Sequence, residues 1–168
     1  KTIQIKDGLI GSEYPAYIIA EIGINHNGDV KLARETIDAA IESGVDAVKL
    51  QTYTTEGFVH PENQIFKAVK SCELKREDCA FLFEHAQRRK AVLFSTPECI
   101  DDIDFLKSLD IPAIKIASMD MNFEDFVKRA ARVGKPVIMS TGMGHLYEVA
   151  QSVRWIEEEG NDKIILLH

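Results

Sequence analysis

The sequence predicts an α/β fold of the (β/α)8 barrel type, with only about six of the eight β/α units present. Six short apolar runs, rich in β-branched residues, alternate with amphipathic segments, which is typical of a parallel sheet covered by helices. Lysines stand inside two of these runs, and polar residues follow most of them. The runs are YIIAE (17–21), AVKLQ (47–51), AVLFS (91–95), AIKIA (113–117), VIMS (137–140) and IILLH (164–168).

The two lysines decide between the two architectures that this alternation allows, an open doubly wound sheet and a barrel. Side chains alternate between two faces along a strand, so Lys49 shares a face with Gln51 and Lys115 shares one with Ala117. A lysine beneath a helix would be costly, whereas in a barrel it can point into the lumen. The segment GINHNG also lacks the GxGxxG pattern of a dinucleotide-binding sheet. The barrel is therefore favoured.

The remaining elements follow in chain order. Residues 1–16 are expected to form an N-terminal hairpin turning at Asp7-Gly8, and residues 17–168 are expected to form the partial barrel. Helices are expected from Asp29 to Gly44, from Asn122 to Gly134, from about 146 to Gly160, and, with weaker caps, at 76–90 and 100–109. Residues 52–74 lack a clean period and form the one long connection, where active-site loops tend to lie.

The composition limits the classes of function. The chain has 168 residues, of which 45% are hydrophobic, so it can bury a core, and its net charge of −7 argues against nucleic acid and anionic membrane surfaces. No apolar run approaches the roughly 18 residues of a membrane span, and the start has no signal-peptide pattern, so a cytoplasmic protein is expected. Cys72, Cys79 and Cys99 lack metal-ligand spacing and are expected to be reduced thiols.

Polar side chains stand at the carboxyl end of each predicted strand. They are Glu21, Lys49 with Gln51, Ser95 with Thr96, Lys115 with Ser118 and Asp120, Ser140 with Thr141, and His168. In a barrel these strand ends meet at one mouth. Two lysines with hydroxyl groups beside them suit phosphate and carboxylate, whereas Glu21 and Asp120 suit proton transfer or sugar hydroxyls. The sequence therefore predicts a pocket for an anion.

Several of these segments also resemble the N-acetylneuraminate (sialic acid) synthase family, whose members condense phosphoenolpyruvate with an N-acetylated hexose to give a sialic or related nonulosonic acid. The resemblance spans about 17–168 and is carried by IIAEIGINHNGD, AVKLQT, FSTP, IPAIKIASMDMN, KPVIMSTGM and ILLH. It implies an aldol-like condensation that releases phosphate, a divalent manganese or magnesium ion that polarises the sugar aldehyde, and a homodimer in the full-length protein.

The resemblance also implies roles for individual residues. The substrate-binding candidates are Lys49, Thr96, Lys115 and Ser118 for phosphoenolpyruvate, Glu21 and Gln51 for the sugar, and Asn25 in the loop that follows the first strand. Asp120 is the candidate general acid or base, with Glu21 as a second catalytic candidate. Many bacterial members have Gly-Glu where this chain has Met119-Asp120, so the shorter acid changes the geometry. No residue of this chain matches a metal ligand of the family.

The length of the chain leaves alternatives open. The family's metal-binding histidines match positions beyond residue 168, its small antifreeze-like domain has no counterpart here, and six strands do not close a barrel of about 250 residues. We therefore expect part of a longer enzyme that is inactive alone. The alternatives are a catalytically inactive partial barrel that binds a ligand or partner, and an unrelated phosphoenolpyruvate-dependent aldolase of the same barrel type. The acceptor is open between N-acetylmannosamine and a diacetamido sugar.

Overall fold

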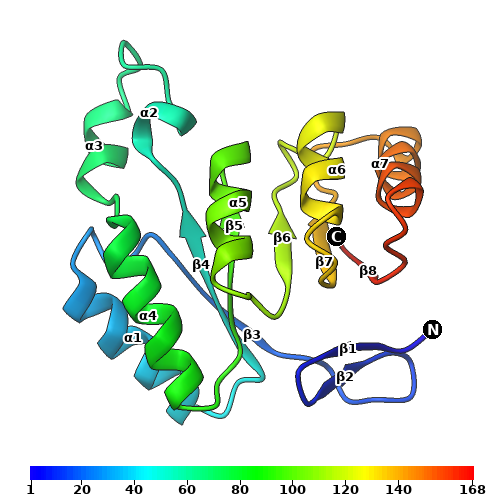
Figure 1. The fold of residues 1–168 in the computed structure, drawn as a ribbon, viewed down its shortest axis with the longest axis horizontal. Helices are drawn as coiled ribbons and strands as arrows, with labels where there is room; N and C mark the ends of the chain where they lie inside the picture. The colour runs from blue at the N-terminus through cyan, green and yellow to red at the C-terminus, as the bar shows by residue number, and fades with distance from the viewer.

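A computed structural model describes residues 1–168 and contains one sheet of six parallel strands. Its strands are β3 (Ile19–Gly23), β4 (Ala47–Thr52), β5 (Leu93–Pro97), β6 (Ile114–Ile116), β7 (Val137–Ser140) and β8 (Ile164–Leu167). Their order in the sheet is their order in the chain, so each strand pairs with the next and β3 and β8 form the two edges (Figure 1). The six strands form half of a barrel, which confirms the predicted fold class.

Seven helices connect or follow the strands. They are α1 (Val30–Glu42), α2 (Thr55–Phe58), α3 (Phe66–Ser71), α4 (Arg76–Arg88), α5 (Ile100–Ser108), α6 (Glu124–Ala131) and α7 (Leu146–Glu158). The five longer helices were predicted, and the connection 52–74 contains the two short ones. The side chain of Asp29 caps α1 by accepting the N–H of Lys31 at 2.8 Å. None of these helices is both long enough and apolar enough to cross a membrane.

The strand predicted at 91–95 begins two residues later in the structure. Lys90 takes a left-handed backbone conformation (φ 57°) after the end of α4, and the N–H of Ala91 donates to the carbonyl of Ala86. Ala91 and Val92 therefore connect this turn to the strand, and β5 runs from Leu93 to Pro97.

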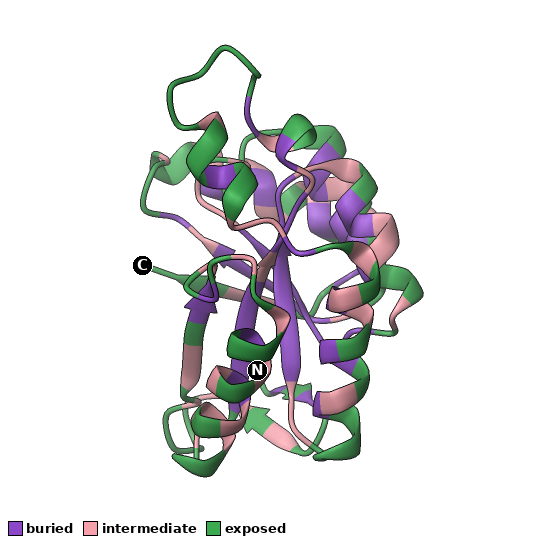
Figure 2. Ribbon diagram, turned by 90° about the vertical axis from the view of Figure 1, so that its left-hand side faces the viewer, coloured by how far each residue is buried: buried purple, intermediate pink, exposed green.

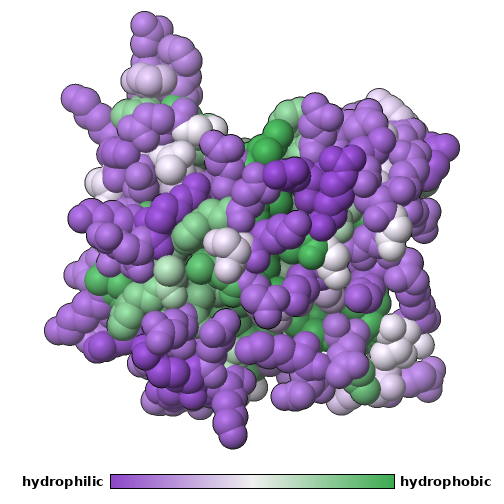
Figure 3. Space-filling view, viewed as in Figure 1, coloured by the Kyte–Doolittle hydropathy of each residue, from purple (hydrophilic) through white to green (hydrophobic).

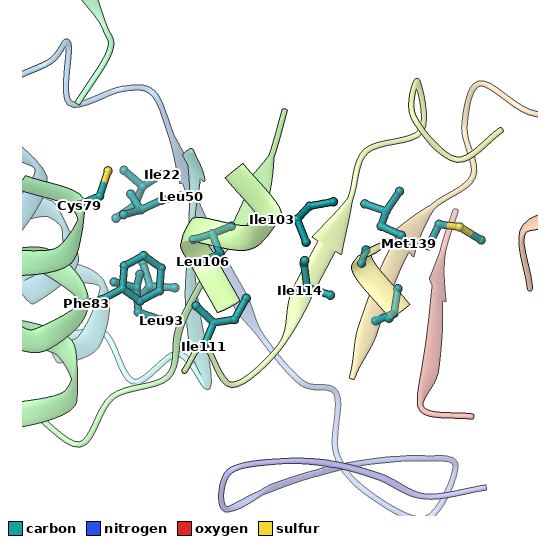
Figure 4. Close-up of a cluster of buried hydrophobic side chains, with 14 of the residues drawn as sticks. Ile22, Leu50, Cys79, Phe83, Leu93, Ile103, Leu106, Ile111, Ile114 and Met139 are labelled. Carbon is teal, nitrogen blue, oxygen red and sulfur yellow. The ribbon is translucent and has the colours of Figure 1, made fainter. Parts of the chain in front are cut away.

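The outer face of the sheet carries the main hydrophobic core, which the helices cover. Figure 4 shows how Leu50 and Ile114 of the strands lie near Phe83 of α4 and Leu106 of α5, all within one buried cluster. The strands are mostly buried, whereas the far sides of the helices are exposed (Figure 2). The surface seen from the helix side is largely hydrophilic, with some hydrophobic residues visible near its middle (Figure 3). This one-sided burial is what amphipathic helices over a sheet require.

The inner face of the sheet has a smaller apolar cluster at the amino ends of the strands. Here Ile5 of the hairpin formed by β1 (Ile3–Ile5) and β2 (Gly8–Ile10) is fully buried. It packs against Ala47, Phe94, Ala113 and Ile138. We call these five residues the floor. The two strands pair as a hairpin at the lower end of the half-barrel, but the turn is at Lys6-Asp7 and not at Asp7-Gly8, because Lys6 takes the left-handed conformation (φ 47°) and Gly8 already pairs with Ile5.

Candidate active site

A pocket of about 380 Å³ opens on the inner face above the floor, toward the carboxyl ends of the strands. Six of the eight candidate residues line it: Glu21, Lys49, Gln51, Thr96, Lys115 and Ser118. They meet there because the strands are parallel and the side-chain period is two. Ser140 and Leu167 also line it, whereas Ser95 lies on the other face, where its hydroxyl bonds to Thr52 at 2.7 Å.

Lys49 lies at the centre of the hydrogen bonds on the β3–β5 side of this pocket. Its ammonium group is 2.7 Å from Oε2 of Glu21 and donates to Oγ1 of Thr96 at 2.8 Å. The lysine is only 8% exposed, whereas Glu21 is exposed. Lys49 is thus a fixed positive charge held between a carboxylate and a hydroxyl group.

Lys115 is equally buried, at 7% exposure, and its ammonium group donates to the carbonyl of Ile116 at 2.6 Å. Burial, and then the positive charge of Lys49, lower the pKa of Lys115 to about 8, although nearby carboxylates partly oppose this. Two buried ammonium groups that repel each other favour a bound anion, because the anion would relieve the repulsion.

Asp120 does not line this pocket but an adjoining hollow of about 410 Å³, which Glu98 and Phe123 also line. Its Oδ2 atom is buried without a hydrogen-bond partner. Burial raises the pKa of Asp120 to about 6, and the positive charge of Lys115 partly opposes that rise. A carboxyl group that titrates this close to neutral pH suits general acid–base work.

Glu98 is a polar residue of the site that sequence reasoning missed. It is 8% exposed, and its Oε1 accepts the side-chain N–H of Gln51 at 3.0 Å. Burial, and then the negative charge of Asp120, raise the pKa of Glu98 to about 7. Glu98 falls on the same face as Thr96, so continuing the period of two past Pro97 could have found it.

Asn25 does not line either of these pockets. Its side chain is exposed and donates to the carbonyl of Ile22 at 2.9 Å, which closes the turn after β3. In the same loop His26 is buried, and its Nδ1 accepts the N–H of Gly28 at 3.1 Å. These contacts give the loop its shape.

A second hollow, of about 390 Å³, lies at the opposite ends of the strands, between the hairpin and the ends of α1 and α4. Two of the charged groups there are engaged within the chain. Arg89 pairs with Asp38 at 2.8 Å, and the ammonium group of Lys6 donates to the carbonyl of Ala91 at 2.8 Å. Because no buried charge is left unpaired, we do not regard it as the active site.

The residues present do not fit a metal centre. No group of three or more His, Cys, Asp or Glu side chains is placed to hold a metal ion. His168, at the end of β8, instead shares a hydrogen bond between its Nδ1 and the hydroxyl of Thr141 at 3.1 Å. We therefore derive no chemical step through a metal ion.

Comparisons with known proteins identify the family of the chain. The chain is 40% identical over 99% of its length to an uncharacterized protein of Methanocaldococcus jannaschii and 36% identical over 94% to an N,N'-diacetyllegionaminic acid synthase of Legionella pneumophila. It spans about half the length of both relatives, 49% in each case. A solved N-acetylneuraminic acid (sialic acid) synthetase of Leptospira borgpetersenii superposes on the whole chain with a TM-score of 0.94, at 31% identity and 59% coverage of that protein. The model of the NeuB family matches residues 36–168, and the chain belongs to that family.

Proposed function

We propose that residues 17–168 form the first part of a synthase barrel that condenses phosphoenolpyruvate with an N-acetylated hexose to give a nonulosonic acid. The observation that carries this proposal is the pair of buried lysines, Lys49 and Lys115, above an apolar floor at the carboxyl ends of the strands. Two of the relatives, a legionaminic acid synthase and a sialic acid synthetase, support the class of reaction.

The two lysines would hold the phosphate and carboxylate groups of phosphoenolpyruvate. Each charge-assisted contact of this kind is worth roughly 1.5–3 kcal/mol. The hydroxyl groups of Thr96 and Ser118, which line the same pocket, would complete the set of donors. Binding would also relieve the repulsion between the two ammonium groups, so the anion and the buried lysines stabilise each other.

In the proposed reaction, C3 of phosphoenolpyruvate forms a bond to the aldehyde carbon of the open-chain sugar, and the aldehyde oxygen takes a proton. Water then adds at C2, and the C–O bond to phosphate breaks, so inorganic phosphate leaves. Asp120 is the proposed acid–base group, because its buried, unpartnered Oδ2 can gain and lose a proton near neutral pH. Glu21 and Gln51 would bind hydroxyl groups of the sugar.

The divalent ion that the family resemblance implies has no fitting ligand set among these residues. The roles proposed above therefore concern only this chain's own side chains. We also propose that the whole protein is cytoplasmic and forms a homodimer, and sedimentation analysis would check the oligomeric state.

Phosphate release tests the proposed function in the whole protein. The assay supplies phosphoenolpyruvate, manganese or magnesium, and either N-acetylmannosamine or a diacetamido hexose. Asp120→Asn should keep the affinity for phosphoenolpyruvate and lose most of the turnover, because an amide keeps the shape but cannot exchange a proton. Asp125→Asn, an exposed change in the first turn of α6, is the matched control.

Normal turnover in Asp120→Asn would move the acid–base role to another residue. If the wild-type protein binds phosphoenolpyruvate but releases no phosphate with any acceptor, the synthase proposal fails, and a partial barrel that only binds its ligand becomes the better account.

A further inference from the structure

The side-chain amide of Gln51 lies between two acidic residues, and the two ends of the amide face different ways. Its Nε2 donates to Oε1 of Glu98 at 3.0 Å. Its Oε1 points toward Gly23, where a Cβ atom added to the glycine would lie 3.3 Å from Oε1 of Gln51 and 3.3 Å from Oε1 of Glu21. The two oxygens therefore converge on the space beside Gly23.

Both of these oxygens are free to accept hydrogen bonds. Glu21 uses its other oxygen, Oε2, to pair with Lys49 at 2.7 Å. Neither Oε1 atom accepts a hydrogen bond from another residue of the chain. Gly23 has no side chain to fill the space, and its φ of 58° disfavours any other residue there. The site thus offers two acceptors and no donor at this point.

Glu98 decides which end of the Gln51 amide faces this space. The two ends of an amide have nearly the same shape but opposite hydrogen-bonding roles, since oxygen accepts and NH₂ donates. An ionised carboxylate can only accept, so it holds the NH₂ end. Without the ionised carboxylate, the amide can rotate so that its NH₂ group donates to Glu21. The space beside Gly23 would then lose the free Gln51 oxygen and face an NH₂ group that is already bonded to Glu21.

We propose that Glu98 is a positioning residue that sets specificity. By accepting a hydrogen bond from the NH₂ group of Gln51, it turns the side-chain carbonyl of Gln51 toward Glu21. The two oxygens then select a hydrogen-bond donor, such as a hydroxyl group, on the second substrate. This inference rests on the proposed function, because it takes the amino sugar as the second substrate. An analogue lacking the donor would leave both oxygens unpaired and bind less well.

The charges around Glu98 make this orientation dependent on pH. The charged groups that act on Glu98 are Asp120, Lys49, Asp102 and, from β6, Lys115. Asp102 is itself paired with Arg76. Because burial and Asp120 raise the pKa of Glu98 to about 7, the carboxylate accepts from Gln51 above that pH. Below it, the protonated carboxyl group can donate, and the amide can turn so that its oxygen accepts.

Glu98→Gln in the whole protein tests this inference, because it keeps the shape of the side chain and removes the charge. Asp101→Asn is the matched control, since Asp101 lies in the first turn of α5 with an exposed side chain. The first readout is the side-chain NH₂ signal of Gln51 in ¹H–¹⁵N spectra. In the wild type and in Asp101→Asn it should titrate near pH 7, and in Glu98→Gln this titration should be lost. An unchanged titration in Glu98→Gln would overturn the inference.

The second readout is the split between the two Michaelis constants. Glu98→Gln should raise the KM for the amino sugar about tenfold to a hundredfold, as expected when buried polar groups lose their partners, and leave the KM for phosphoenolpyruvate unchanged. An unchanged KM for the sugar, or an equal rise in both constants, would contradict a role in specificity. If the wild-type protein releases no phosphate, the proposed function fails, and the Gln51 signal still decides the role of Glu98.

Discussion

The floor and the polar pocket above it, which we call the mouth, lie on the same strands of the inner face. Their residues are only two positions apart along a strand and differ completely in chemistry. Ala47 and Lys49 both lie on β4. Ala113 lies just before β6, and Lys115 lies within it. The lower residues pack around Ile5 in an apolar cluster, whereas the upper residues line the polar pocket. One step of the strand period therefore separates the residues that stabilise the fold from those proposed to act on substrate.

The two layers also have opposite effects on stability. The floor contributes stability through apolar burial. In the mouth, the pKa of Lys115 is about 8 in the folded chain, below its ordinary value of 10.5, so the fold disfavours the charged lysine. This costs stability below pH 8, on the order of 1–3 kcal/mol, and the cost disappears as the pH rises from about 8 toward the unfolded value.

The largest expected effect comes from opening the floor. Ile5→Ala should destabilise the protein by about 2–5 kcal/mol, because it removes a fully buried side chain and leaves a cavity. Urea unfolding measures the loss, and Leu9→Ala, on the partly exposed side of the same hairpin, is the control. Ile5 does not line the pocket, so the folded variant should keep its affinity for phosphoenolpyruvate. A loss of stability no greater than that of Leu9→Ala would contradict the role of the floor.

Lys115→Met should have the opposite effects to Ile5→Ala, with weaker binding of phosphoenolpyruvate and no loss of stability. The affinity for phosphoenolpyruvate should fall by roughly one to two powers of ten, since a charge-assisted contact is lost. Stability at pH 7 should rise, because a buried charge is replaced with an apolar side chain of similar length. Calorimetric titration and thermal unfolding check the two halves. An affinity equal to that of the wild type would remove Lys115 from the anion site.

Thr96→Val should have the smallest effect. Valine keeps the shape of the side chain but loses the hydroxyl group that accepts from Lys49 at 2.8 Å. A neutral hydrogen-bond partner is worth about 0.5–1.5 kcal/mol, so the affinity for phosphoenolpyruvate should fall roughly twofold to tenfold. Thr36→Val on α1, away from the pocket, is the control. A loss as large as that of Lys115→Met would show that the hydroxyl contacts the anion more strongly than we propose.

The sequence predicts the layers well because they follow from a period of two along each strand. It places Lys49, Thr96 and Lys115 on one face, and the structure brings them into one pocket. It does not predict the position of Asn25, whose amide is used within its own turn, because a local hydrogen bond competes with any ligand contact. It also misses Glu98, because the predicted strand ends before Pro97, although the period of two continued past that proline places Glu98 on the face of Thr96.

The packing of the hairpin under the sheet could not be predicted either. Ile5 lies far in sequence from Phe94 and Ile138, and no local pattern links them. The raised pKa values of Glu98 and Asp120 likewise depend on burial that only the folded chain shows. What the sequence leaves undetermined is thus mainly contact between distant segments.

The affinity of the whole protein for phosphoenolpyruvate, measured by calorimetry between about pH 7.5 and pH 9.5, tests the anion site most directly. In this range Glu98 and Asp120 are largely ionised, and Lys115 changes charge near pH 8. The protonated lysine binds the anion, so the affinity of the wild type should fall as the pH rises through about 8, whereas that of Lys115→Met should be weak and nearly independent of pH. A wild-type affinity that stays constant over this range, or matches that of Lys115→Met, would contradict an anion site built on the buried lysines.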